Sequence, residues 1–108
     1  MARKKLDTLT ESMYYVLLSL TEERHGYGIM QYANQLTNGR VNIGAGTLYA
    51  LLSRFESEGL IRATKEEEKR KYYQLTEEGR KILEEEFDRL RRQVADGNYV
   101  LLRTGDKG

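Results

Sequence analysis

The hydrophobic pattern of this chain changes its period once, near Gly59, and this change limits the folds open to it. Before Gly59, apolar residues recur every three or four positions, as on the buried face of a helix. Residues 60–75 instead alternate between apolar and polar side chains on either side of a charged tip, which is typical of a β-hairpin. We therefore predict a mostly α-helical chain with one small hairpin.

The first predicted helix begins at Thr8 or Thr10 and runs to about Thr21. Thr8 and Glu11 have the spacing of a capping box. The helix is apolar on more than one side, so we expect it to be covered both by its own domain and by a second partner.

Two further helices are predicted before the hairpin. The second starts near Gly26 and stops at residues 38–39, an Asn-Gly pair. The third opens at residues 44–47 and ends at Gly59. The expected buried faces are Ile29, Met30, Ala33 and Leu36 in the second helix, and Leu48, Leu51, Leu52 and Phe55 in the third.

A fourth helix is predicted after the hairpin, with Thr76 as its cap. Its apolar residues follow the four-three-four spacing of a coiled-coil seam: Leu83, Phe87, Leu90 and Val94. The seam reaches Leu101 only if the helix continues through residues 97–98, a Gly-Asn pair, and the sequence leaves that open. Residues 103–108 are predicted to be a loose tail.

Composition excludes several classes of function. The chain has no cysteine and one histidine, which argues against thiol catalysis, disulfides and a histidine metal cluster. It has no glycine-rich phosphate loop or nucleophile elbow, so we expect no catalytic residues, metal or cofactor. The longest apolar run, residues 13–20, is too short to cross a bilayer, so a cytoplasmic protein is expected.

The outer face of the third helix has an unusual composition. Opposite its apolar stripe lie small residues, with Thr47, Tyr49 and Arg54 on the flanks. No acidic residue occurs in residues 24–55, although 17 of the 108 residues are acidic. A helix in the major groove lies between phosphates, which repel carboxylates, and small side chains let its backbone approach. Three helices and a hairpin with such a face predict a winged helix-turn-helix.

Four segments carry a resemblance to a known family: LTESMYYVLLSL, HGYGI, GTLYALLSRFESEGLI and RKYYQLTEEG. In this order and spacing, over about Leu9 to Leu90, the chain closely resembles the PadR-type transcriptional regulators. The resemblance implies a homodimeric repressor of bacteria or archaea that binds double-stranded DNA, with affinity that a small hydrophobic or aromatic effector can relieve. It divides the chain into a DNA-binding domain with a basic arm (1–75), a dimerisation helix (76–102) and the tail.

The resemblance and the residue pattern together give two sets of candidate site residues. The expected DNA-binding residues are His25, Tyr27, Ala45, Gly46, Thr47, Tyr49, Ser53, Arg54, Lys69, Arg70 and Lys71. The expected dimer-interface or effector-pocket residues are Met13, Tyr14, Leu17, Leu83, Phe87, Leu90 and Val94.

Two features depart from the family pattern and one alternative remains. The wing tip, KEEEKRK, has no glycine, so Glu66, Glu67 and Glu68 must point away from a bound duplex. The chain has no tryptophan, and Leu90 stands near the position where some drug-sensing relatives carry one. The alternative function is a winged helix that binds another protein and no DNA; the absence of acid from residues 24–55 speaks against it.

Overall fold

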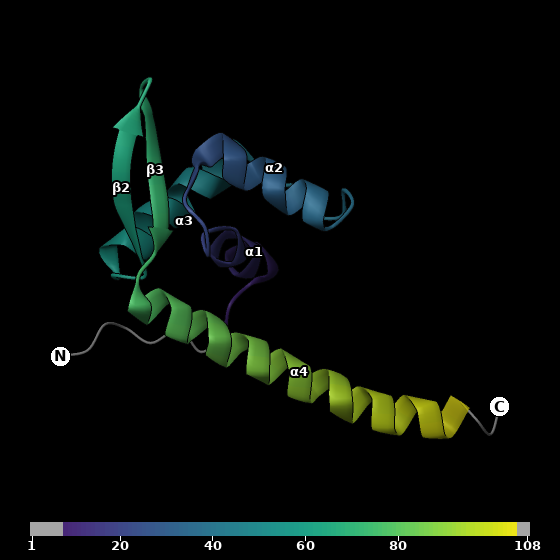
Figure 1. The fold of residues 1–108 in the computed structure, drawn as a ribbon. Helices are drawn as coiled ribbons and strands as arrows, with labels where there is room; N and C mark the ends of the chain where they lie inside the picture. Colours follow the sequence, from purple (N-terminus) through teal and green to yellow (C-terminus); the bar gives the residue numbers. More distant parts are fainter. Residues whose placement is uncertain (1–7, 106–108) are drawn as a thin grey trace.

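The computed structural model describes residues 8–105 and confirms the predicted fold class (Figure 1). The basic arm, residues 1–7, lies outside the described residues. The elements are α1 (Glu11–Ser19), β1 (Arg24–His25), α2 (Gly26–Leu36), α3 (Ala45–Ser57), β2 (Ile61–Glu67), β3 (Arg70–Leu75) and α4 (Glu77–Gly105). Helices α1 to α3 pack beside the hairpin, and α4 runs beneath α1 and extends well beyond it.

The sheet has three strands in the order β1-β3-β2, and both pairings are antiparallel. The sequence predicted the β2–β3 hairpin but not β1, because a strand of two residues is too short to show a period. In β1, His25 pairs with Tyr72 of β3. This pairing fixes the start of α2 against the wing.

Helix α1 begins at Thr10, one of the two caps considered. The Thr10 hydroxyl accepts from the Met13 amide at 3.2 Å, and the Met13 sulfur accepts from the Thr10 amide. The capping box predicted from Thr8 to Glu11 is therefore wrong. Leu9 is buried between the two threonines, and its packing places Thr10 rather than Thr8 at the helix start.

The core lies between α1, α2, α3 and the hairpin. Its fully buried side chains come from all of these elements and include Val16, Leu17, Ile29, Leu48, Leu52, Phe55 and Leu60. Leu36, which the helical period placed in the core, is instead 52% exposed. It lies in the last turn of α2, which projects past α1 and has no element above it (Figure 1).

The wing turns through two residues, Glu68 and Lys69, because Glu67 pairs with Arg70. Both turn residues have positive φ, 50° and 66°. Two left-handed residues make a tight turn that glycine and asparagine favour and that costs other residues about 1 kcal/mol or more each. The glycine-free tip therefore holds a strained turn.

We expect Glu68→Gly to raise the free energy of unfolding by about 0.5–1 kcal/mol, because glycine relieves the left-handed strain. The matched control is Glu66→Gly, which removes the same charge from a strand position and should lower stability by a similar amount. Urea unfolding of both variants measures the two effects. If Glu68→Gly lost as much stability as Glu66→Gly, the turn would be shown to be unstrained.

Helix α4 continues through Gly97 and Asn98 to Gly105, which settles the question the sequence left open. The prediction of a loose tail from residue 103 is wrong for residues 103–105, which are helical, and residues 106–108 lie outside the described part of the chain. The run of good helix formers on both sides of Gly97 outweighs the roughly 1 kcal/mol cost of one glycine. The helix is 29 residues long, about 43 Å.

One carboxylate on α4, that of Glu86, is buried against the start of α1. Arg89 donates to it from Nε at 3.0 Å and from Nη2 at 2.5 Å. The Arg89 hydrogen bonds, with help from the Arg89 charge and the Leu9 amide, hold the pKa of Glu86 below its ordinary value, although burial opposes them. The folded protein therefore favours the ionised form.

This lowered pKa predicts a loss of stability in acid. The contribution of ionised Glu86 is complete above the unfolded glutamate pKa, about 4.3, and disappears as pH falls through the lower folded value. We expect Glu86→Gln to be less stable than the parent by about 1–3 kcal/mol at pH 7. The difference should shrink steadily below about pH 4.3. Urea unfolding at several pH values measures it, and a constant difference would contradict the assignment.

Candidate nucleic-acid interface

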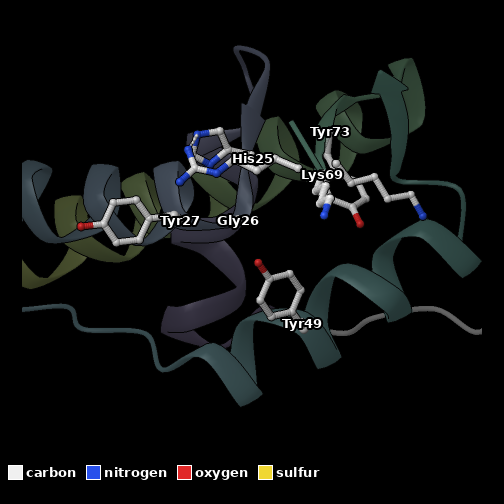
Figure 2. A pocket seen from close by; sticks show the side chains of 8 residues that line it. His25, Gly26, Tyr27, Tyr49, Lys69 and Tyr73 are labelled. Carbon is white, nitrogen blue, oxygen red and sulfur yellow. Dashed lines mark hydrogen bonds between the residues drawn. The ribbon is translucent and has the colours of Figure 1, made fainter. Parts of the chain in front are cut away.

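The start of α2, the exposed side of α3 and strand β3 border one hollow of about 270 Å³. Its lining contains cations and hydroxyl groups and no carboxylate: His25, Gly26, Tyr27, Tyr49, Lys69, Arg70, Lys71 and Tyr73. Figure 2 shows Tyr49 rising from α3 on one side, with His25 and the Lys69–Tyr73 side chains across from it. Six of the predicted DNA-binding residues are thus brought together around one hollow.

The outer face of α3 is fully open. Thr47, Tyr49 and Ser53 are exposed, while the other side of the helix is buried in the core. A side chain built at Gly46 would meet nothing within 4 Å, and the same holds for Gly44, the N-cap. Ala45 is also exposed. The first free amides of α3 are therefore accessible, as the small-residue pattern predicted.

Tyr49 spans the gap between α3 and α2. Its ring is 52% exposed, yet a Cβ atom added at Gly26 would overlap the Tyr49 hydroxyl and lie 2.8 Å from Cζ. The absence of a side chain at Gly26 gives the Tyr49 hydroxyl room to lie against the start of α2. About half of the Tyr49 surface faces solvent on the α3 face, at 52% exposure.

His25 and Arg70 meet at the edge of the hollow as two hydrogen-bond donors. His25 Nδ1 accepts from the Gly28 amide at 3.0 Å and so caps α2. A neutral ring then carries its hydrogen on Nε2, which lies 3.2 Å from Arg70 Nη1. Because Arg70 directs an N–H at Nε2 and a guanidinium cannot accept, the two donors face each other. Arg70 has to turn aside before both groups can donate to an acceptor such as a phosphate oxygen.

The other wing cations also face the hollow. Lys71 and Tyr73, which lie two apart on β3, line it on one side of the strand, and Lys69 of the wing turn joins them. The Lys71 ammonium lies 6.0 Å from the centre of the Tyr73 ring. Glu66, Glu67 and Glu68 do not line the hollow, and Glu67 pairs with Lys65 at 3.5 Å. Positive charge therefore faces the hollow.

Two of the predicted DNA-binding residues differ from the rest: Arg54 has an ion pair on its own helix, and the Tyr27 side chain has a different direction. Arg54 Nε donates to Glu58 at 3.1 Å, so its charge is partly balanced on its own helix. Tyr27 is 54% exposed, and its side chain points away from Tyr49 in Figure 2. Tyr27 lines the hollow, whereas Arg54 does not.

The structure corrects part of the predicted interface set. Met13, Leu17 and Leu83 are buried inside the protomer, because α4 packs on α1 of its own chain. They offer almost no surface to a partner. Tyr14 and Leu90 are half-buried, and Phe87 and Val94 are 51% and 61% exposed. These last four keep the surface that an interface needs.

Sequence reasoning missed two residues of the hollow, Gly26 and Tyr73. The two glycines on either side of Tyr27 indicated that another segment of the chain comes close to the backbone of α2, but they did not indicate which segment. Tyr73 was assigned to one face of the hairpin, and burial raises its pKa. Nothing in the sequence placed it beside Lys71 and Tyr49.

In residues 8–105, no group of three or more histidine, aspartate or glutamate side chains is arranged to hold a metal ion. Over the same residues, none of the helices combines the length and apolar character needed to cross a membrane.

Three helices, a three-stranded wing and a cation-lined hollow beside α3 define a winged helix-turn-helix protein. The particular family follows from comparison: the model of the transcriptional regulator PadR-like family matches residues 16–85. The chain therefore belongs to that family and is a DNA-binding transcriptional regulator.

Solved structures agree with this assignment, and one curated relative is similar in sequence but uncharacterised. A PadR-like regulator from Bacillus cereus is 30% identical with a TM-score of 0.70, covering 83% of this chain and 90% of its own. A PadR family regulator from Eggerthella lenta is 33% identical with a TM-score of 0.66, covering 86% and 82%. An uncharacterised Lysinibacillus sphaericus protein is 38% identical over 63% of this chain, and the match spans 66% of that protein, just under two thirds.

Proposed function

We propose that this regulator is a cytoplasmic repressor that binds an inverted-repeat operator as a homodimer. Helix α3 enters the major groove, where Thr47 and Tyr49 contact bases, with Ala45, Gly46, Ser53 and Arg54 along the same face. The wing cations Lys69, Arg70 and Lys71 contact phosphates. The observation that carries the proposal is the open, carboxylate-free face of α3 beside a hollow lined with donors.

The hollow supports phosphate contact at the start of α2. His25 Nε2 and Arg70 Nη1 lie 3.2 Å apart, with the positive end of the α2 dipole beside them. A phosphate oxygen at the edge of the hollow accepts from both groups once Arg70 turns aside from the ring. His25 and Arg70, with Tyr27 at the margin, then position the protein on the backbone while α3 reads bases.

The exposed apolar residues of α4 support dimerisation. Phe87 and Val94 are more than half exposed, and so are Tyr99 and Leu102 near the end of the helix. Apolar groups spaced along a helix that leaves its own domain have to be covered by another chain. A second copy related by twofold symmetry presents two α3 helices about 34 Å apart, which matches one turn of the duplex.

We also propose that a small effector molecule binds at the dimer contact. A small hydrophobic or aromatic molecule binding between the half-buried Tyr14 and the exposed Phe87 of a partner would compete with or reshape the dimer contact. Leu90, half-buried, gives such a site an aliphatic rather than an aromatic wall. Effector binding would then change the dimer geometry and, with it, the affinity for DNA.

The alternative is a winged helix that binds a protein and no DNA. The two functions differ in their response to salt, because neutralising phosphates releases counterions and makes DNA affinity fall steeply as salt rises. Fluorescence anisotropy of the parent with duplex DNA, measured from about 50 to about 300 mM salt, therefore distinguishes DNA binding from protein binding. Absence of binding at the low end would overturn the proposal.

Arg70→Ala should weaken binding to every duplex sequence by a similar factor. It should also reduce the slope of log affinity against log salt by about one unit, the share of one phosphate contact. The matched control is Arg92→Ala, since Arg92 is an exposed arginine on α4 away from the hollow. Its slope should equal that of the parent. Identical slopes for both variants would remove Arg70 from the phosphate set.

A further inference from the structure

Gly26 is the first residue of α2, and the Tyr49 side chain from α3 covers it. The residue lines the hollow, yet it is buried. A Cβ atom built there would overlap the Tyr49 hydroxyl, lie 2.8 Å from Tyr49 Cζ and lie 3.1 Å from Tyr49 Cε1. These three nearest atoms all belong to the outer half of one ring. The missing side chain at position 26 is therefore the space that the end of Tyr49 uses.

The backbone at position 26 does not itself need a glycine. Glycine serves either where φ is positive or where another group approaches the backbone closely. Gly39 and Gly59 have positive φ, whereas Gly26 does not. Alanine can adopt the same backbone and is the best helix former. The close approach of Tyr49 is therefore the structural use of this glycine.

The overlap at Gly26 differs in kind from the overlap at Gly79. At Gly79 an added Cβ meets the backbone carbonyl of Leu60, which cannot move without moving the chain. At Gly26 it meets the far end of a side chain that is 52% exposed. The Tyr49 ring can turn about its own torsions while both helices stay in place. An alanine at position 26 should therefore displace Tyr49 and leave the fold intact.

The place of the Tyr49 hydroxyl depends on this packing. With the residues that the structure describes, the hydroxyl makes no hydrogen bond that could fix it. Ordinary contact between heavy atoms begins at about 3.5 Å, so an added Cβ moves the end of the ring by about 1 Å. A hydrogen bond to a base edge needs a separation of about 2.7–3.2 Å. A displacement of that size is enough to lose such a bond.

We propose that Gly26 is a positioning residue for base reading: the space it leaves determines where the Tyr49 hydroxyl stands, and so which base pair Tyr49 prefers. This inference rests on the proposed function, in which α3 lies in the major groove and Tyr49 contacts bases. Position 26 acts through Tyr49 and not through a DNA contact of its own. Removing the Tyr49 ring must therefore remove the influence of position 26 on binding.

The first experiment follows the Tyr49 ring in the free protein. 3-Fluorotyrosine replaces the 8 tyrosines, and the fluorine resonance of Tyr49 is identified by its absence from Tyr49→Phe. We expect this resonance to shift in Gly26→Ala, while circular dichroism and thermal unfolding stay close to those of the parent. An unshifted resonance would overturn the inference. Loss of the folded state in Gly26→Ala would also overturn it, because Tyr49 would then be unable to give way.

Gly28→Ala is the matched control for both experiments. It adds the same methyl group to the same helix, where the Cβ would lie in ordinary contact, 3.5 Å from His25 Cε1. The Tyr49 resonance and the preferred DNA sequence should both match those of the parent. Effects as large as those of Gly26→Ala would show that any methyl group at the start of α2 disturbs binding, and would overturn the inference.

The second experiment is a double-mutant cycle on DNA binding. Fluorescence anisotropy compares the parent, Gly26→Ala, Tyr49→Ala and the double variant on an operator selected with the parent and on random duplex. Gly26→Ala should bind the operator about tenfold more weakly than the parent and random duplex about equally well. In the Tyr49→Ala background the same substitution should change operator affinity by less than about twofold.

The outcomes of the cycle separate the inference from the proposed function. Equal losses from Gly26→Ala in both backgrounds would show that position 26 acts without Tyr49, and would overturn the inference alone. So would operator binding by Gly26→Ala as tight as that of the parent. Undiminished operator binding by Tyr49→Ala, or a parent that selects no duplex, would instead refute the proposed function and the inference with it.

Selection from a random pool adds the readout that a merely structural role would not move. Gly26→Ala should return the parent's sequence with its preference altered or relaxed at one base pair of each half-site. This should be the same base pair at which Tyr49→Ala relaxes the preference. A uniform weakening of all positions in Gly26→Ala would contradict a role in positioning Tyr49.

Discussion

Alanine in place of Tyr49 should abolish most of the preference for operator over random duplex, lowering specific affinity by about 10- to 100-fold, or 1–3 kcal/mol. Tyr49 is 52% exposed on the α3 face and lines the hollow, so its ring and hydroxyl can reach a base edge in the groove. Fluorescence anisotropy with operator and random duplexes measures the effect.

Two controls separate base contact from damage to the fold. Tyr49→Phe keeps the ring and removes the hydroxyl, so its affinity shows how much of the effect belongs to hydrogen bonding. Circular dichroism and thermal unfolding should be nearly unchanged in both variants, because Tyr49 lies outside the buried core. If Tyr49→Ala bound operator as tightly as the parent, the assignment of the α3 face as the reading surface would be wrong.

Alanine in place of Gly79 should lower the free energy of unfolding by about 3–5 kcal/mol, the upper range for a single substitution. A Cβ atom there would overlap the Leu60 carbonyl oxygen, lie 2.9 Å from the carbonyl carbon and 3.1 Å from Leu75 Cδ2. The carbonyl cannot move freely, because it accepts from the Thr76 amide at 3.0 Å. The start of α4 must therefore shift away from the hairpin.

Gly97 provides the matched control on the same helix. An added Cβ there meets nothing within 4 Å, so Gly97→Ala should raise stability by about 0.5–1 kcal/mol through helix propensity alone. Urea unfolding of both variants compares a packing glycine with a free one. A mild effect at Gly79 would show that the start of α4 can shift away from the hairpin at little cost.

The architecture could be predicted from the sequence because its signals are local. The change of period at Gly59, the cap at Thr76 and the break at residues 38–39 each depend on a few neighbouring residues. The structure has these features in place: Gly59 and Asn38 have positive φ, and Thr76 caps α4. The absence of acid in residues 24–55 likewise indicated the α3 face before any geometry was known.

The misplaced residues depend on contacts between distant segments. Burial of Leu17 and Leu83 follows from how α4 packs on α1, which no periodicity specifies. Glu86 stands in a run of three glutamates on α4, and only the fold shows that it is the buried one of the three. The contact between His25 and Arg70 needs the short strand β1. Local patterns predict elements, whereas these contacts require their arrangement in space.

Selection of bound duplexes from a random pool tests the central claim most directly, because it examines DNA recognition and twofold symmetry at once. The account predicts enrichment of an inverted repeat whose half-site centres lie about 10 base pairs apart. A pool that stays random after several rounds at low ionic strength, with a protein that sediments as a monomer, would contradict it.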